Sequence, residues 1–367
     1  MSYARTEFGG FSTLLKIDFK LFILVMTIVI LGLATLFSVS GGDLNLVLKQ
    51  LVRIFIGLIA MVMLAQIHPD NFRLFSPFLY IFGILLLILT IFFGVGKTAD
   101  RWLDLYFIRF QPSELMKIFV PLMIASFYSD KALPPKLKNL IIAALIILIP
   151  AILIAKQPDL GTAILITSSG GIAILLAGVK LAHIFLGTGV VIGAIPLLWS
   201  NMYDYQKSRV LSFFSPDQDV LGSGYHLAQS KIALGSGGLF GKGYMNGTQS
   251  KLDFLPENHT DFIFSAFGEE FGFMGILLLI TLYVLTIFRG MSISIKATDN
   301  FSRILSGTLI LTIFLYVLVN IGMVIGILPI VGAPLPFMSY GGTSMLTVFA
   351  ALGIIMSIKS HQRLMRK

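Results

Sequence analysis

The sequence predicts an all-α polytopic membrane protein with about ten transmembrane helices. Hydrophobic residues make up 56% of the 367 positions and charged residues only 12%, and the mean hydropathy is +0.90. A soluble domain of this length needs a far more polar surface. Apolar runs long enough to cross a bilayer recur along the chain, so we expect one integral membrane domain over residues 1–367.

The expected spans lie, in order, near residues 21–39, 48–66, 77–94, 114–129, 139–155, 160–178, 181–200, 261–288, 304–328 and 338–358. The fourth is short, and the others fit the roughly 17 to 25 residues that a membrane helix needs. The first run starts only near residue 21 and has no small-residue cleavage site before Gly41. We therefore expect it to be retained as a helix, and not removed as part of a signal peptide.

The distribution of basic residues indicates the orientation. With a cytoplasmic N-terminus, the inner segments hold 15 of the 27 Lys and Arg residues but only 5 of the 18 Asp and Glu residues. The positive-inside rule then places both termini in the cytoplasm. The net charge of +9 is explained by this topology, so it gives no reason to expect nucleic acid as a partner. The absence of cysteine excludes disulfides and thiolate metal sites.

Two outer segments are longer than the other connections: residues 95–113, and the large periplasmic loop 201–260 between the seventh and eighth helices. Long loops in a compact fold are usually functional or disordered. The second loop mixes aromatics, glycines and charges, which does not resemble low-complexity disorder. No internal repeat is visible, and this weakens the prediction of an inverted-repeat transporter.

The glycine-rich run Gly235–Gly243 does not fit a Walker A phosphate loop. Such a motif ending at Gly241-Lys242 would need glycine at Ser236 and a hydroxyl residue at Gly243. A set of tight turns is the favoured interpretation, although backbone N–H groups in such turns can still hold a diphosphate. The segment Gly332–Gly342 contains two prolines and three glycines, so we expect broken backbone that lines protein or water.

Asp261 lies where the long outer loop passes into an apolar helix. A carboxylate within a membrane costs roughly 2.5 to 3.5 kcal/mol at a helix centre, so it is a functional candidate by default. The position equally allows Asp261 to be a solvated helix cap. The same helical face carries a stripe of small residues, Ser265, Gly268, Gly272 and Gly275, and Glu270 lies on the opposite face. Such a stripe indicates either a groove or close helix packing.

Glu114 and Lys117 form a second candidate site at the outer end of a helix that opens with Gln111-Pro112. As an i, i+3 pair they can neutralise each other, which is a sufficient structural role. The alternative is that Lys117 holds an anionic ligand while Glu114 orients it. Further charged residues lie on the outer side, near the ends of helices: Arg101, Arg109, Asp159 and Arg209. The cations among them suit a diphosphate, because arginine binds phosphate bidentately.

Five motifs together resemble the SEDS family (shape, elongation, division and sporulation proteins). They occur in family order over most of the chain: 111–115 (QPSEL), 156–162 (KQPDLGT), the glycines of 235–243, 256–264 (PENHTDFIF) and 334–342 (PLPFMSYGG). The GYH at 224–226, the 327–334 run, the short N-terminus and the brief basic tail resemble the rod-shape branch of Gram-negative bacteria more than the division branch.

The resemblance implies a ten-helix inner-membrane glycosyltransferase that polymerises lipid II with a class B penicillin-binding protein and other elongation-complex membrane proteins. The family's essential aspartate falls on Asp261, which we expect to act as general base. The resemblance places Glu114, Lys117 and Asp159 in a central cavity and Arg101, Trp102 and Arg109 at its outer loop, and we expect nearby cations, with Arg209, to bind the diphosphate.

A divalent ion, Mg²⁺ or Mn²⁺, could assist this reaction, but the sequence offers no dedicated ligand cluster for a metal. Three alternatives remain open: a transporter that flips lipid II, a non-catalytic scaffold for wall-synthesis enzymes, and a division paralogue of the same family. A flippase needs a polar path through the whole bilayer, whereas the charged candidates here concentrate on the outer side.

Overall fold

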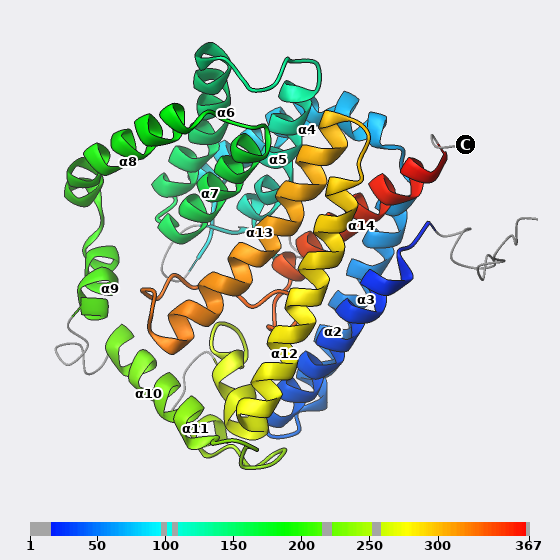
Figure 1. Cartoon of the computed structure of the whole chain (residues 1–367). Coiled ribbons are helices and arrows are strands. Elements are labelled where there is room, and N and C mark those ends of the chain that lie inside the picture. The colour runs from blue at the N-terminus through cyan, green and yellow to red at the C-terminus, as the bar shows by residue number, and fades with distance from the viewer. Residues whose placement is uncertain (1–15, 97–100, 105–108, 215–221, 252–257, 365–367) are drawn as a thin grey trace, which may run out of the picture.

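The computed structural model describes residues 16–96, 101–104, 109–214, 222–251 and 258–364. Its membrane helices correspond one to one with the expected spans (Figure 1): α2 (Phe19–Val39), α3 (Leu44–Gln66), α4 (Pro69–Phe93), α5 (Pro112–Ser129), α6 (Leu137–Lys156), α7 (Leu160–Leu176), α8 (Leu181–Asn201), α12 (Ile263–Ile295), α13 (Asn300–Ile325) and α14 (Thr343–Leu364). The all-α prediction is therefore confirmed.

Within the described residues, eight helices are long and apolar enough to cross a membrane. Two helices that correspond to expected spans are not among these eight: α5, which carries Glu114 and Lys117, and α7, which has only 17 residues. Neighbouring helices cover most of α5, whereas α7 is partly exposed, with Ile164 and Leu175 on its surface. The protein is thus a multi-pass membrane protein, and ten spans with both termini inside stay a prediction.

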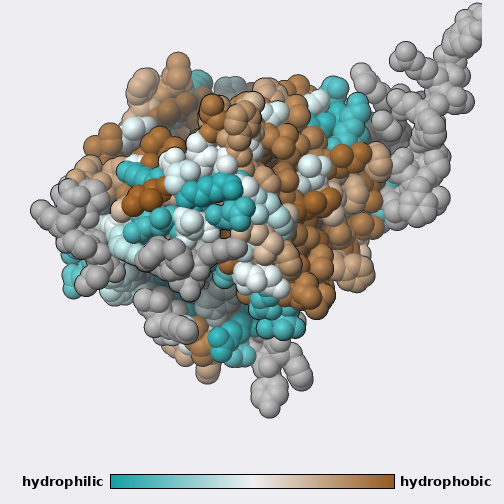
Figure 2. Space-filling model, turned by 90° about the horizontal axis from the view of Figure 1, so that it is seen from below, coloured by the Kyte–Doolittle hydropathy of each residue, from teal (hydrophilic) through white to brown (hydrophobic). Residues whose placement is uncertain are grey.

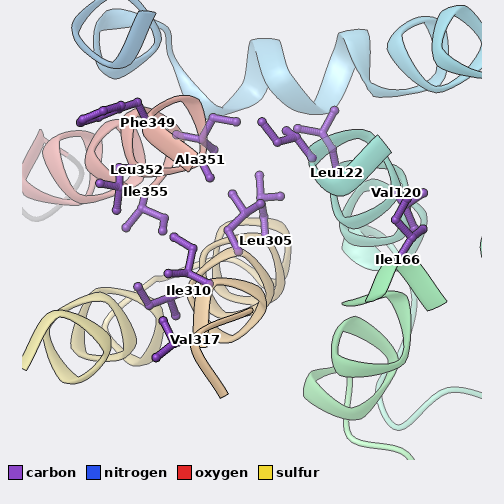
Figure 3. Packing of buried hydrophobic residues seen from close by; sticks show 14 of the residues in the cluster. Val120, Leu122, Ile166, Leu305, Ile310, Val317, Phe349, Ala351, Leu352 and Ile355 are labelled. Carbon is purple, nitrogen blue, oxygen red and sulfur yellow. The ribbon is translucent and has the colours of Figure 1, made fainter. Parts of the chain in front are cut away.

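The central element of the bundle is α13. It packs against α5, α7, α12 and α14, and α3 lies along α14 over much of its length. Figure 3 shows the core between these helices, with Leu305 and Ile310 of α13 facing Ala351 and Ile355 of α14. By contrast, α8 buries none of its residues and lies at the rim (Figure 1).

The outer loops contain short elements. In the first, β1 (Leu103–Asp104) and β2 (Arg109–Phe110) form an antiparallel pair. The described parts of the large loop form α9 (Asp204–Phe214), α10 (Ser223–Ser236) and α11 (Thr248–Lys251). Helices α10 and α11 lie beneath the outer ends of α12 and α13 in Figure 1, so this loop covers the outer face of the bundle.

The glycine-rich run packs onto a break in α12. Gly272 has φ 65° and ψ −166°, and a Cβ on it would lie 2.2 Å from the Gly241 nitrogen. The N–H groups of Lys242 and Gly243 donate to the carbonyls of Glu269 and Glu270, at 3.0 and 3.1 Å. These two N–H groups are therefore unavailable to a diphosphate, and the tight-turn interpretation is confirmed.

The small-residue stripe on α12 forms part of this close contact. A Cβ on Gly268 would lie 2.5 Å from a side-chain carbon of Leu234 on α10, and a Cβ on Gly237 would lie 2.2 Å from the Gly268 carbonyl oxygen. Ser265 exchanges a 2.7 Å hydrogen bond with Ser230 of α10. Of the two roles expected for the stripe, close packing is the one that these contacts show.

Candidate active site

Asp261 lies in a turn just before α12 and is held by α13. The helix begins at Ile263 with Phe262 as its N-cap, so the alternative in which Asp261 caps the helix does not match the observed cap position. The side-chain amide of Asn320 donates to the Asp261 carbonyl at 2.9 Å and to the Ala333 carbonyl at 2.7 Å. One buried amide thus fixes both the aspartate turn and the segment before α14.

The segment 332–342 is non-helical, as expected from its prolines and glycines. The Ser339 hydroxyl donates to the Thr260 carbonyl at 2.6 Å and accepts from the Leu335 N–H at 2.7 Å. The Tyr340 N–H donates to the His259 carbonyl at 2.9 Å. A Cβ on Gly332 would lie 3.4 Å from Asp261 Oδ2, so the segment closes directly over the aspartate.

Glu114 and Lys117 form a buried ion pair in the first turns of α5, with 2.6 Å between Oε1 and Nζ. Pro112 fits the first turn of a helix, and Glu114 favours its positive end. Lys117 Nζ also lies 4.3 Å from the ring centre of Tyr316 on α13. The second carboxylate oxygen, Glu114 Oε2, is buried without a hydrogen-bond partner, and so is Ser113 Oγ.

Asp159 joins α7 to the outer loops. It is the N-cap of α7, accepting from the Thr162 N–H at 3.2 Å, and it also accepts from Gln111 Nε2 at 3.1 Å. Arg101 Nη1 lies 3.6 Å from Asp159 Oδ1, and Arg101 Nη2 donates to the Pro158 carbonyl at 2.7 Å. The carboxylate therefore links the first outer loop to the beginnings of α5 and α7.

The remaining expected site residues lie further out. Arg209 on α9 lies 5.9 Å from the ring centre of Tyr205, whose hydroxyl donates to the Pro158 carbonyl. Arg109 is exposed and pairs with Asp104 across the β1–β2 turn, at 3.3 Å. Trp102 forms a backbone bridge with Val95. Among these residues, Arg209 neighbours Tyr205, which contacts the residue before Asp159, and the ion pair of Arg109 stays within its own hairpin.

A cavity of about 40 Å³ lies beside Lys117 and Tyr316. Its polar end carries Lys117 and Tyr316, and its walls are mostly apolar side chains of α13, the 334–337 segment and α14. Tyr316 interacts electrostatically with Lys117, Glu114 and Asp159. Asp261 is not part of the cavity lining, but Ser339, which lines it, bonds to the residue before Asp261.

Within the described ranges, no group of three or more His, Asp or Glu side chains is arranged to hold a metal ion. The predicted divalent cation therefore has no ligand set to which it can be assigned.

Sequence reasoning missed several residues that build the site. Tyr316 and Asn320 were not candidates, yet they contact Lys117 and hold the Asp261 turn. A signal was present, because polar or hydroxyl side chains recur every four residues in this apolar helix and so share one face: Thr308, Thr312, Tyr316 and Asn320. All four are buried, as expected for polar groups that face the bundle interior.

The chain is similar to several bacterial proteins over nearly its full length. It is 46% identical over 353 residues to the peptidoglycan glycosyltransferase MrdB of Escherichia coli K12, covering 96% of this chain and 95% of that protein. It is 35% identical to the probable peptidoglycan glycosyltransferase FtsW of Coxiella burnetii, covering 93% of this chain and 95% of that protein. With the stage V sporulation protein E of Bacillus subtilis the identity is 33%, and the coverage is 94% and 98%.

Solved structures share the fold. A chain from a structure titled "Structural coordination of polymerization and crosslinking by a peptidoglycan synthase complex" matches with a TM-score of 0.82 and 27% identity, covering 94% of this chain and 98% of that one. The rod shape determining protein RodA of Thermus thermophilus matches with a TM-score of 0.71 and 27% identity, covering 93% and 96%. Since the family described as "Cell cycle protein", which unites FtsW, RodA and SpoVE, matches residues 13–364, the chain belongs to that family.

Proposed function

We propose that this protein is a peptidoglycan glycosyltransferase of the inner membrane that polymerises lipid II into glycan strands for cell-wall elongation. Support comes from the named activity of MrdB, to which the chain is 46% identical over 96% of its length. The identity to the division protein FtsW of Coxiella burnetii is lower, 35%, which favours the elongation role. We further propose a class B penicillin-binding protein as partner, because a structurally similar chain comes from a complex of polymerisation and crosslinking.

The observation that carries the proposal is the way Asp261 is held beside the cavity. Its turn is bonded to α13 through Asn320 and to the cavity wall through Ser339. The cavity presents one buried cation, Lys117, in otherwise apolar walls. A pocket with few fixed polar groups in an apolar lining is typical of sites for amphipathic ligands, and a polyprenyl diphosphate is such a ligand.

In the proposed reaction, a sugar hydroxyl of the acceptor attacks the anomeric carbon of the donor. The new glycosidic C–O bond forms as the C–O bond to the diphosphate breaks, and the diphosphate leaves with the bonding electrons. Asp261 takes the proton of the attacking hydroxyl as general base, a role worth about 10² to 10⁴ in rate. Asn320 positions Asp261 through its backbone and does not itself need to touch substrate.

Charge on the leaving diphosphate needs stabilisation by fixed cations. Lys117 is placed for this, and Glu114 holds it at 2.6 Å while keeping its other oxygen, Oε2, without a protein partner. That oxygen can accept a hydrogen bond from a substrate hydroxyl or amide. Arg101 contacts Pro158 and Asp159, and Arg209 lies beside Tyr205, which bonds to Pro158, so these two arginines add positive charge at the outer side.

The location of the polar groups also weighs against a flippase. Figure 2, which views the bundle from the side of α10 and α11, shows hydrophilic residues across the middle of this outer face, with hydrophobic residues around much of it. Farther in, the core between α13 and α14 combines aliphatic and aromatic side chains (Figure 3) with uncharged hydroxyls such as Thr308 and Thr347. A path for a charged diphosphate would need charged or strongly polar groups at that depth as well.

The test is glycan polymerisation from lipid II by the purified protein, with and without a class B penicillin-binding protein. We expect glycan strands to form and the partner to raise the rate. A preparation that leaves lipid II unpolymerised in both conditions, yet moves it between the leaflets of a vesicle, would replace this proposal with the flippase.

A further inference from the structure

The structure also holds a cation that the site above does not use. Arg53 lies on α3, nine residues after Leu44, which places it about 14 Å along the helix from the outer end. Its neighbours Val52 and Phe55 are 58% and 64% exposed, so this part of α3 faces lipid. An arginine at such a depth is costly unless an anion compensates it.

No described residue supplies that anion. The ion pairs of the described ranges do not include Arg53, and its Nη1 is buried without a hydrogen-bond partner. The guanidinium lies 4.3 Å from the ring centre of Tyr340, which holds it in place without neutralising it. The side chain is therefore fixed, charged and short of an acceptor.

The surroundings of Arg53 add positive potential. Helix α14 begins at Thr343, and a Cβ on the preceding residue, Gly342, would lie 3.8 Å from Arg53 Nε. Arg53 therefore lies beside the N-terminus of α14. The N-terminus of a helix carries partial positive charge and free N–H groups. Lys49, one turn toward the outside on the same face of α3, is exposed and forms no ion pair with a described residue.

We propose that Lys49 and Arg53 bind the diphosphate of a second lipid-linked substrate molecule, at the edge of α3 that faces the outer leaflet. This inference rests on the proposed function. Polymerisation joins two molecules that each carry a polyprenyl diphosphate: the donor loses its carrier and the acceptor keeps its own. Lys117 serves one diphosphate, and a second cation site is needed for the other. A diphosphate suits two cations spaced one helical turn apart, since it offers several oxygens to both.

The placement of this site agrees with its role. Gln50 of α3 donates to the Ser339 carbonyl at 3.3 Å, and the Ser339 hydroxyl donates to the carbonyl of Thr260, the residue before Asp261. A diphosphate at Arg53 is thus separated from the Asp261 turn by one short layer of protein, Tyr340 and Ser339. The polyprenyl chain would run along the exposed apolar residues of α3 into the bilayer.

The test measures binding of undecaprenyl diphosphate, which has no sugar to transfer, to the full-length protein in phosphatidylcholine nanodiscs. We expect wild type to bind about two molecules and Arg53→Gln about one, or to show at least a tenfold loss of affinity at one site. Arg53→Lys keeps the charge and should stay within about threefold of wild type. Lys20→Gln, which removes an exposed charge at the inner end of α2, is the matched control and should bind as wild type.

Two outcomes overturn the site. One is unchanged binding by an Arg53→Gln protein with wild-type thermal stability. The other is loss of the Arg53-dependent binding when phosphatidylglycerol is present in excess, which would assign the site to bulk anionic lipid. Because the assay involves no chemistry, it separates the two proposals: Arg53-dependent binding without strand formation from lipid II would refute the proposed function alone.

Discussion

Asn320 and Asp261 are joined by a hydrogen bond that connects α13, five residues before its end at Ile325, to the proposed catalytic turn. The Asn320 amide donates to the Asp261 carbonyl at 2.9 Å from a residue that is itself fully buried. Because the bond is to the backbone carbonyl, it fixes the position of the Asp261 main chain and leaves the carboxylate oxygens to other partners. The strength of this hydrogen bond and its role in positioning Asp261 can both be measured.

We expect Asn320→Ala to lower stability and to slow polymerisation more than it weakens substrate binding. It leaves the buried Ala333 carbonyl and the partly buried Asp261 carbonyl without this donor, at about 1 to 3 kcal/mol for the buried one and less for the other. The measurements are thermal unfolding in detergent, and kcat and KM on lipid II. The control is Thr308→Val on the same helix, which removes a hydroxyl that donates to the Ile304 carbonyl within α13. Equal losses of kcat in the two variants would remove the positioning role.

Asp261→Asn should preserve folding and partner binding while abolishing polymerisation. The amide has nearly the same shape, and the turn is held by backbone contacts that the substitution keeps, but an amide does not accept the proton of the attacking hydroxyl. Strand formation from lipid II by the purified variant is the readout. Activity within about tenfold of wild type would show that Asp261 is not the base.

Lys117→Ala should strongly reduce accumulation of folded protein. Removing one member of a buried ion pair leaves the other uncompensated, at about 3 to 5 kcal/mol, and Glu114 is buried. Adding Glu114→Gln to the same protein should restore much of the stability, whereas polymerisation stays low because the cation is still missing. If the double variant regains activity along with stability, Lys117 has only a structural role.

A pH dependence is expected at the inner end of the bundle, where Asp18 accepts hydrogen bonds from Arg289 at 2.7 Å, from Lys359 and from the Leu21 N–H. Burial raises the pKa of Asp18, but these bonds outweigh it and lower the pKa from 3.8 to about 2. A lowered folded pKa stabilises the protein above pH 4, and this contribution is lost as the pH falls from about 4 to 2.

The size of the Asp18 effect is about 2 kcal/mol, since one pKa unit corresponds to 1.36 kcal/mol. Thermal unfolding of wild type and Asp18→Asn, followed from pH 6 down to pH 3, checks it. The gap between the two melting temperatures should shrink as the pH falls below about 4. A constant gap over this range would assign the stabilisation to groups other than the ionised Asp18.

Gly272→Ala should destabilise the outer half of the protein. The residue has φ 65°, and an added Cβ would lie 2.2 Å from the Gly241 nitrogen, which belongs to fixed backbone. The control is Gly171→Ala in α7, where a Cβ meets nothing within 4 Å and the backbone is helical. There the substitution should be neutral or stabilising by up to about 1 kcal/mol. Similar melting temperatures for the two variants would contradict the close contact at Gly272.

The sequence alone determined where the membrane helices lie. Hydropathy is a local property, and within a bilayer an apolar run must satisfy its backbone hydrogen bonds as a helix. The expected spans therefore match α2 to α8, α12 and α13 within a few residues, except at the start of α4 and the end of α12, where polar residues extend the helix. The last span is displaced, because α14 begins at Thr343, after the broken 338–342 backbone, and runs on to Leu364. The motif residues that carried the family resemblance were also readable from the sequence, and the family is confirmed.

Only the tertiary structure decided how the site is assembled. Helical periodicity assumed an unbroken helix from Asp261 onward, but α12 starts at Ile263 and breaks at Gly272, because the 237–241 backbone approaches there. Asn320 and Ser339 became important only through contacts with residues 59 and 79 positions away. Such contacts depend on packing among distant segments, and no local pattern in a single sequence encodes which buried amide meets which carbonyl.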